Sequence, residues 1–141
     1  MRVHPDYEAH DARVYAWEER HIDHTTNTGL VFKLLELWRD AGRKTKLRIA
    51  MTPGPLSTNP RLVATHQKTK GDHLIWLPMD CGDAIALHEL AHALVDAKLR
   101  RAVAPFPHGT TWADHYIGLL DEHMGADAWA LRYHYGCMVT R

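Results

Sequence analysis

The strongest constraint on the fold of this 141-residue chain is the segment His88-Glu89-Leu90-Ala91-His92, which lies in an apolar, alanine-rich run. Such a run favours a helix, and residues four positions apart on a helix share one face. The imidazoles of His88 and His92 can therefore hold one metal ion. Glu89 lies beside the open coordination position, where a carboxylate can take a proton from a metal-activated water molecule. The pattern predicts a zinc site with Glu89 as general base.

A hydrolytic zinc ion usually has a third protein ligand, and three residues beyond the motif can supply it. His108 follows a rigid Pro-x-Pro segment and precedes a glycine, so its side chain can point into the site. Asp114 and Glu122 are carboxylate alternatives. Residues 102–108 can span up to about 23 Å, more than the roughly 14 Å that the helix climbs beyond His92. We expect His108 as the third ligand and keep Asp114 and Glu122 as alternatives.

The rest of the chain shows helical and extended patterns in turn. Apolar residues recur at helical spacing in 5–20, 30–41, 80–101, 110–125 and 126–135. Strand patterns occupy 44–51, 61–68 and 72–77. In the first helix, Glu18 and Glu19 are expected to face outward, and Asn27 or Thr28 is expected to cap the second helix. This order places a small sheet directly before the motif helix.

Two parts of a hydrolytic site remain open in the sequence. The strand 73–77 directly precedes the motif helix. As an edge strand it would pair with an extended peptide, and as an interior strand it would only support the helix. An oxyanion that develops during hydrolysis needs a nearby donor, for which Tyr116, Tyr133 and His115 are candidates.

Composition fits one globular domain over residues 1–141, because 45% of the residues are hydrophobic and 24% are charged. The formal net charge of +0 argues against a general electrostatic interaction with nucleic acids or anionic membranes. Cys81 and Cys137 are too few for a disulfide scaffold, so we expect reduced thiols. No run approaches membrane-spanning length and no apolar signal region is present at the N-terminus, so we expect a cytoplasmic protein.

The motifs resemble those of known zinc enzymes. His88-Glu89-Leu90-Ala91-His92 followed by His108-Gly109-Thr110-Thr111-Trp112 resembles the signature of SprT-like and related minimal zincin metallopeptidases. Arg13-Val14-Tyr15-Ala16-Trp17-Glu18, with Leu-Pro before the motif helix, resembles the HExxH zinc metallohydrolases of actinobacteria and their phages. The resemblance implies an α+β, minigluzincin-like fold: a small, mostly antiparallel three-stranded sheet packed on the motif helix, with flanking N- and C-terminal helices. It also implies zinc held by His88, His92 and His108, with Glu89 as catalytic base.

The motif and the reachable third histidine together predict a zinc-dependent hydrolase, in the first place a metallopeptidase acting on peptide or protein substrates. Glu89 would take a proton from the attacking water and deliver it to the leaving amine. Two alternatives stay open. One is a metal-dependent hydrolase of RNA or of a small amide, and the other is a non-enzymatic zinc-stabilised module that binds or regulates a partner.

Overall fold

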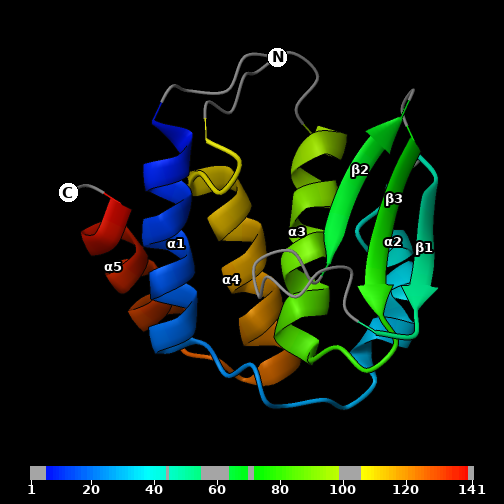
Figure 1. The fold of residues 1–141 in the computed structure, drawn as a ribbon, viewed down its shortest axis with the longest axis horizontal. Coiled ribbons are helices and arrows are strands. Elements are labelled where there is room, and N and C mark those ends of the chain that lie inside the picture. Colours follow the sequence, from blue (N-terminus) through cyan, green and yellow to red (C-terminus); the bar gives the residue numbers. More distant parts are fainter. Residues whose placement is uncertain (1–5, 44, 55–63, 70–71, 99–105, 140–141) are drawn as a thin grey trace.

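The computed structural model describes residues 6–43, 45–54, 64–69, 72–98 and 106–139 (Figure 1). In chain order the elements are α1 (Tyr7–His21), the 3-10 helix η1 (Leu30–Lys33), α2 (Leu34–Asp40), β1 (Leu47–Thr52), β2 (Thr65–Thr69), β3 (Asp72–Pro78), α3 (Asp83–Lys98), α4 (Thr110–Met124) and α5 (Ala128–Val139). The described residues form an α+β fold with five α-helices and a three-stranded sheet, which is the class that the sequence predicts. In this part of the chain, no helix is both long and apolar enough to cross a membrane.

The sheet is mixed, with the strand order β1-β3-β2. β2 is antiparallel to β3, with His66 opposite Ile75, whereas β1 is parallel to β3, with Ile49 opposite Ile75. The prediction of a mostly antiparallel sheet is therefore wrong. A parallel pair needs a connection of a dozen or more residues, and the segment 53–71 between β1 and β3 is long enough. Strand patterns in the sequence carry no information on direction, because side chains alternate in the same way in both kinds of pair.

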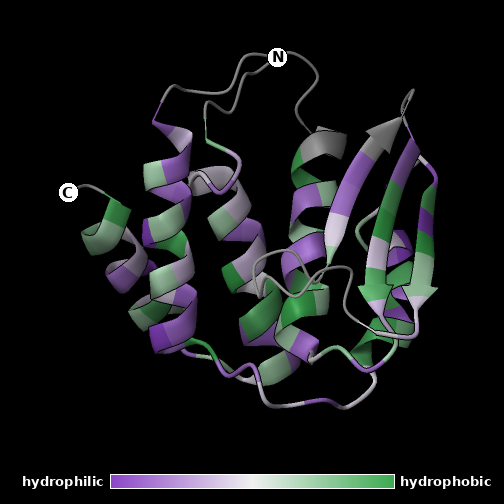
Figure 2. Ribbon diagram, in the orientation of Figure 1, coloured by the Kyte–Doolittle hydropathy of each residue, from purple (hydrophilic) through white to green (hydrophobic). Residues whose placement is uncertain are grey.

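α3 lies at the centre of the molecule and is covered on two sides (Figure 1). On one side it packs with α2 against a face of the sheet, and on the other it packs against α4, with α1 and α5 beyond. Leu87 and Ala91 join the apolar cluster of α1, α4 and α5, whereas Leu90 and Leu94 join the cluster of α2 and the sheet. Hydrophobic residues dominate the turns where α3 and α4 lie side by side (Figure 2). A helix that is covered on both sides is apolar nearly all round, so its buried polar residues call for a specific role.

The first residue of α3 also holds the segment that leads into α2. The Asp83 carboxylate accepts hydrogen bonds from the Thr28 backbone N–H at 3.0 Å, the Thr28 hydroxyl at 2.7 Å and the Leu30 N–H at 3.3 Å. The predicted cap by Asn27 or Thr28 is wrong. Gly29, with a φ of 82°, occupies the cap position of η1 without a side-chain hydrogen bond. The N–H groups of Thr28 and Leu30, just before and at the start of η1, are satisfied by Asp83 instead, a residue far away in sequence.

Candidate metal centre

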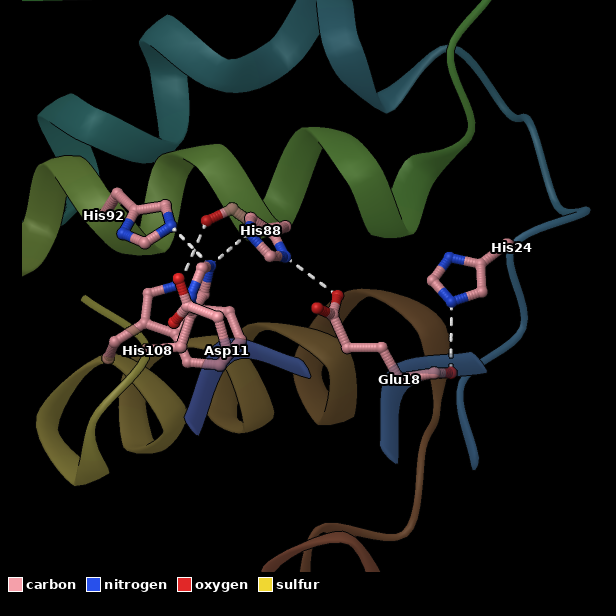
Figure 3. Close-up of polar contacts among 7 residues, drawn as sticks. Asp11, Glu18, His24, His88, His92 and His108 are labelled. Atoms are coloured by element: carbon pink, nitrogen blue, oxygen red, sulfur yellow. Dashed lines mark hydrogen bonds and ion pairs between the residues drawn. The ribbon is translucent and has the colours of Figure 1, made fainter. Parts of the chain in front are cut away.

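Two successive turns of α3 and the loop before α4 bring three imidazole rings together (Figure 3). The Nε2 atom of His108 lies 3.1 Å from Nε2 of His88 and 3.2 Å from Nε2 of His92. Among the described residues, these three histidines form a group whose potential ligand atoms all lie within 4.8 Å of one another. The histidines that the sequence singles out therefore meet at one point, close enough to bind a single metal ion.

The spacing of the three nitrogen atoms fits zinc. Tetrahedral zinc with Zn–N bonds of about 2.0–2.1 Å places neighbouring nitrogens about 3.3 Å apart, close to the 3.1 and 3.2 Å in this structure. Hydrogen bonding among the rings explains their convergence less well, because one Nε2 proton serves one neighbour at a time. Three imidazole ligands would leave a fourth tetrahedral position for water or substrate.

Two carboxylates of α1 bind the far sides of these rings. Glu18 Oε2 lies 2.8 Å from His88 Nδ1, and Asp11 Oδ1 lies 2.8 Å from His108 Nδ1 (Figure 3). Such bonds hold a ring proton on Nδ1 and direct Nε2 towards the cluster, where it can bind a metal once it carries no proton. The prediction that Glu18 faces outward is wrong, since its side chain is only 7% exposed. The neighbouring Glu19 is exposed, as predicted.

The position of His108 is fixed by helices at both ends of the chain. The Tyr135 hydroxyl of α5 donates a hydrogen bond of 2.6 Å to the backbone carbonyl of His108, and Tyr15 of α1 lies edge-on to its ring. Trp112, in the first turn of α4, packs on all three imidazoles with ring centroids 4.7 to 5.6 Å apart. Its indole N–H also donates to the backbone carbonyl of His88 at 3.3 Å. These contacts hold the third histidine in place.

Burial and neighbouring charges give the three imidazoles different proton affinities. Burial alone would lower the pKa of His88, but the charge and hydrogen bond of Glu18 outweigh it and raise this pKa to about 9. Burial, together with the surrounding imidazoles, lowers the pKa of His92 well below its ordinary value. Burial also lowers the pKa of His108, although the hydrogen bond to Asp11 acts in the opposite direction. Two of the rings are thus held neutral, which is the form that binds metals.

Glu89 follows His88 on α3 and is almost completely buried, with 6% of its surface exposed. Burial raises the pKa of its carboxyl group; the charge of His88 opposes this shift, and the charge of Glu18 adds to it. A bound dication would favour the ionised form instead. A carboxyl group with a raised pKa is a candidate for accepting and returning a proton. The role of Glu89 as general base stays a prediction.

The two carboxylate alternatives to His108 have exposed side chains and partners of their own. The Asp114 side chain is 62% exposed and lies 3.7 Å from Arg132, whereas that of Glu122 is 74% exposed and lies 3.8 Å from His123. Because α4 starts just after His108 and rises 1.5 Å per residue, Glu122 is carried about 20 Å along the helix. The structure brings His108, and neither carboxylate, to the two histidines of the motif.

The predicted oxyanion donors do not gather at the open side of the cluster. Tyr116 is fully buried with its ring 5.4 Å from that of His88, and burial together with the nearby Glu18 carboxylate raises the pKa of Tyr116 well above its ordinary value. It therefore lies on the Nδ1 side of His88, away from the ligand nitrogen. Tyr133 is 57% exposed and stacks on another aromatic ring of α5. His115 is half-buried on α4.

The strand 73–77 is an interior strand, because β3 lies between β1 and β2. The edge strand next to α3 is β2, which contributes a histidine that the sequence does not single out. The ring of His66 is nearly parallel to that of His92, with 8° between their planes and 6.3 Å between their centroids. Nε2 of His66 also lies 3.0 Å from Nδ1 of His73. A row of imidazoles thus extends from the cluster into the sheet.

Sequence reasoning missed Asp11 and Glu18, although a signal for them exists. The two acids are seven residues apart, which places them on one face of a helix two turns apart. Trp17 and Val14, which are fully buried, show that α1 packs tightly in the core. An acidic pair at this spacing on a core-packed helix, in a chain that also contains a histidine motif, matches the carboxylate–histidine pairing of metal sites.

Comparisons of the chain with protein-family models, with curated proteins and with solved structures give no match. A functional assignment therefore depends on the geometry of the three-histidine group and the carboxylates around it.

Proposed function

We propose that the protein is a zinc-dependent hydrolase, and specifically a metallopeptidase. The observation that carries this proposal is the convergence of three Nε2 atoms, from His88, His92 and His108. Glu89, the residue after His88 on α3, is buried and supplies the carboxylate that such a reaction needs. The donor set fits zinc in number, type and spacing. The carboxylates of Asp11 and Glu18 support it further, because metal-binding imidazoles commonly donate their second N–H to such groups.

The side chains have separate roles in the proposed reaction. A zinc ion supplies Lewis acidity, which polarises a carbonyl group and makes water nucleophilic near neutral pH. Glu89 accepts the proton of the attacking water and passes it to the leaving amine. Asp11 and Glu18 orient the ligand rings and keep them in one tautomer.

A peptide is favoured as the substrate by the position of β2. This strand is an edge of the sheet and lies alongside α3, so its outer backbone groups can pair with an extended chain close to the histidines (Figure 1). Pairing of this kind binds the peptide backbone and accepts many side chains. The net charge of +0 offers no general attraction for RNA.

The test compares wild type with Glu89→Gln and with Glu122→Gln, a matched substitution at an exposed glutamate. Zinc content and the hydrolysis of a mixture of quenched fluorescent peptides are measured for each. We expect one zinc ion per chain in all three proteins and a loss of activity of about 10²- to 10⁴-fold in Glu89→Gln alone.

The same measurements separate the alternatives. A wild-type protein that binds zinc but cleaves no peptide rejects the peptidase, and a panel of RNA and small amides then tests the other hydrolases. A protein that unfolds when zinc is removed, and whose Glu89→Gln variant behaves like wild type in every assay, is a zinc-stabilised module instead. Wild type without affinity for zinc rejects the zinc peptidase and the zinc-stabilised module.

A further inference from the structure

We propose that Tyr116 of α4 is a positioning residue of the metal centre, whose hydroxyl donates a hydrogen bond to Oε1 of Glu18 and thereby holds this carboxylate against His88. The inference rests on the proposed function, because it concerns how a zinc ligand is presented. It adds one residue to the chain of contacts that leads outwards from the metal: His88 binds the ion, Glu18 holds His88, and Tyr116 holds Glu18.

The contact with His88 uses only one oxygen of the Glu18 carboxylate. Oε2 lies 2.8 Å from Nδ1 of His88 (Figure 3). Oε1 is buried and has no hydrogen-bond partner among the described residues. The Glu18 side chain is only 7% exposed, so bulk solvent is a poor substitute for a protein donor. A buried acceptor without a partner is costly, and more so on a charged group. Oε1 therefore calls for a donor.

The hydroxyl of Tyr116 is a donor in the same situation. Tyr116 is fully buried, and its hydroxyl oxygen also has no hydrogen-bond partner in the part of the chain that the structure describes. Its ring lies edge-on to the ring of His88, with 5.4 Å between the centroids. A phenol can donate, whereas an ionised carboxylate can only accept. An unpaired donor and an unpaired acceptor are thus buried beside the same imidazole.

The electrostatics show that the phenol and the carboxylate are neighbours. Burial is the largest cause that raises the pKa of Tyr116 well above its ordinary value, and the charge of Glu18 and a hydrogen bond to Glu18 are the next two. Both of these effects require the two side chains to be close. Since neither oxygen has a partner in strict hydrogen-bond geometry, we infer that a small rotation of either side chain completes the bond between them.

Two tryptophans keep the ring of Tyr116 in this place. Trp17 of α1 lies edge-on to it with 6.2 Å between the ring centroids, and Trp112 of α4 lies 5.0 Å away. Trp112 and Tyr116 are four residues apart, so they project from the same face of α4. One face of α4 therefore packs on the imidazoles through Trp112 and brings a hydroxyl to the carboxylate behind them through Tyr116.

A carboxylate that is bound at both oxygens cannot turn away from its imidazole. The last torsion of a glutamate side chain is broad and is fixed poorly by a single contact. Donation to Oε1 would fix this torsion in Glu18, and it would also favour the ionised form that accepts the Nδ1 proton of His88. The direction of the His88 Nε2 atom then depends on Tyr116, a residue that does not touch the metal.

The first test asks whether the hydroxyl is bonded. Tyr116→Phe removes one oxygen atom and keeps the ring, and Tyr133→Phe is the matched control, because Tyr133 is 57% exposed on α5. Loss of a hydrogen bond to a charged group should lower the melting temperature of the metal-free protein by about 4–10 °C in Tyr116→Phe alone. Removing an unpaired hydroxyl would instead relieve the cost of burying it. An unchanged or higher melting temperature in Tyr116→Phe therefore overturns the proposal.

The second test measures positioning through zinc affinity, by competition with a fluorescent chelator. Tyr116→Phe should bind zinc about 3- to 10-fold more weakly, a smaller loss than for a residue in direct contact with a ligand, and Tyr133→Phe should match wild type. Glu18→Gln removes the charge that the hydroxyl serves, so adding Tyr116→Phe to it should weaken binding by less than about twofold. An equal loss in both backgrounds would show that Tyr116 acts without Glu18 and overturns the proposal.

A third measurement needs no substitution at Tyr116. In protein labelled with ¹³C-tyrosine, the buried hydroxyl proton of Tyr116 should exchange slowly with water and correlate with the carbons of its ring. A charge-assisted bond is shorter than a neutral one, so this proton should move upfield when Glu18→Gln removes the charge. A hydroxyl proton at the same chemical shift in wild type and in Glu18→Gln overturns the assignment.

The outcomes distinguish this inference from the proposed function. A wild type that binds zinc and cleaves no peptide refutes the peptidase, and the zinc affinities and the hydroxyl signal then still decide the role of Tyr116, because they do not depend on turnover. A wild type without affinity for zinc refutes the zinc site and the role of Tyr116 with it. A zinc-binding wild type whose Tyr116→Phe variant binds zinc equally well refutes the role of Tyr116 alone.

Discussion

Glu18 and Asp11 determine how two of the three histidines present their nitrogen atoms. Each carboxylate binds one Nδ1 at 2.8 Å, so the opposite nitrogen, Nε2, points into the cluster. A buried carboxylate is costly unless it is paired. Glu18 meets this requirement through His88, and that pairing brings the pKa of Glu18 below its ordinary value although burial alone would raise it. The pair therefore explains both a buried acid and an oriented imidazole.

The substitution Glu18→Gln should weaken zinc binding by about 10- to 100-fold, because glutamine accepts the bond from His88 without the charge that favours a cationic site. Glu19→Gln is the matched control, since Glu19 is the exposed neighbour on the same helix. Competition with a fluorescent zinc chelator measures both affinities. Equal affinities in the two variants would show that the Glu18 contact has no influence on the metal.

The two thiols should differ sharply in reactivity. Burial, followed by the nearby carboxylates Asp80 and Asp83, raises the pKa of the Cys81 thiol to about 11, whereas Cys137 is exposed. The thiolate is the reactive form, and its share at Cys81 stays small until the pH approaches that pKa. At pH 8, iodoacetamide should therefore modify Cys137 and leave Cys81 intact. Mass spectrometry of tryptic peptides measures this, with the urea-unfolded protein as the control in which both react.

At the scale of elements, Asp83 connects the start of α3 to the start of η1. Its carboxylate accepts three hydrogen bonds from Thr28 and Leu30. α3 carries His88, and α2 packs beside α3 on the same face of the sheet. The Asp83 side chain therefore sets how these two helices lie relative to each other.

Replacing Asp83 by alanine should lower the free energy of unfolding by about 2–3 kcal/mol, because the N–H and O–H groups of Thr28 and the N–H group of Leu30 lose a charged acceptor in a place that is at least partly buried. Asp80→Ala is the control, because Asp80 is exposed and such positions change stability by about 0.5 kcal/mol or less. Urea unfolding followed by circular dichroism gives both values. A loss in Asp83→Ala no larger than that in the control would mean that η1 is held by its apolar contacts alone.

The sequence predicts the helices and strands better than the way in which they pair and contact one another. The helices and strands follow from local periodicity, which each segment carries by itself. The parallel pairing of β1 and β3 depends on contacts between distant segments, and so does the capping of η1 by Asp83. The burial of Glu18 was missed for a similar reason: local patterns classify a glutamate by its polarity, whereas its burial depends on a histidine that lies seventy residues away in sequence. His88 and His92 were predictable because helical spacing alone brings them together.

At the scale of the whole molecule, two apolar clusters meet along α3. Trp17, Trp112 and Tyr116 are among the largest buried side chains on one side, and Leu34, Ile75 and Leu77 are among those on the other. None of these six side chains belongs to the three-histidine group. We therefore predict that they stay packed without a metal ion, unlike the cores of small zinc modules that have no fold of their own without zinc.

Removal of zinc should therefore leave the fold intact and lower its thermal stability. Free zinc at a thousand times its dissociation constant stabilises a protein by about 4 kcal/mol, which corresponds to roughly 10–15 °C in melting temperature for a chain of this size. Far-UV circular dichroism before and after dialysis against a chelator should show the same helix content, with the lower melting temperature restored by added zinc. Loss of the helical signal in the metal-free protein would show instead that the fold depends on zinc.

The anchoring of His108 by α1 and α5 has a consequence for the order of events during protein synthesis. Asp11 and Glu18 leave the ribosome long before the histidines that they bind, and Tyr135, which holds the His108 carbonyl, leaves it later than all of them. At about 5–20 residues per second, the 124 residues from Asp11 to Tyr135 (135 − 11) take roughly 6 to 25 seconds to translate. The nascent chain cannot complete the three-histidine centre until Tyr135 has been made, so we predict that a metal ion is captured in the final geometry only after that point.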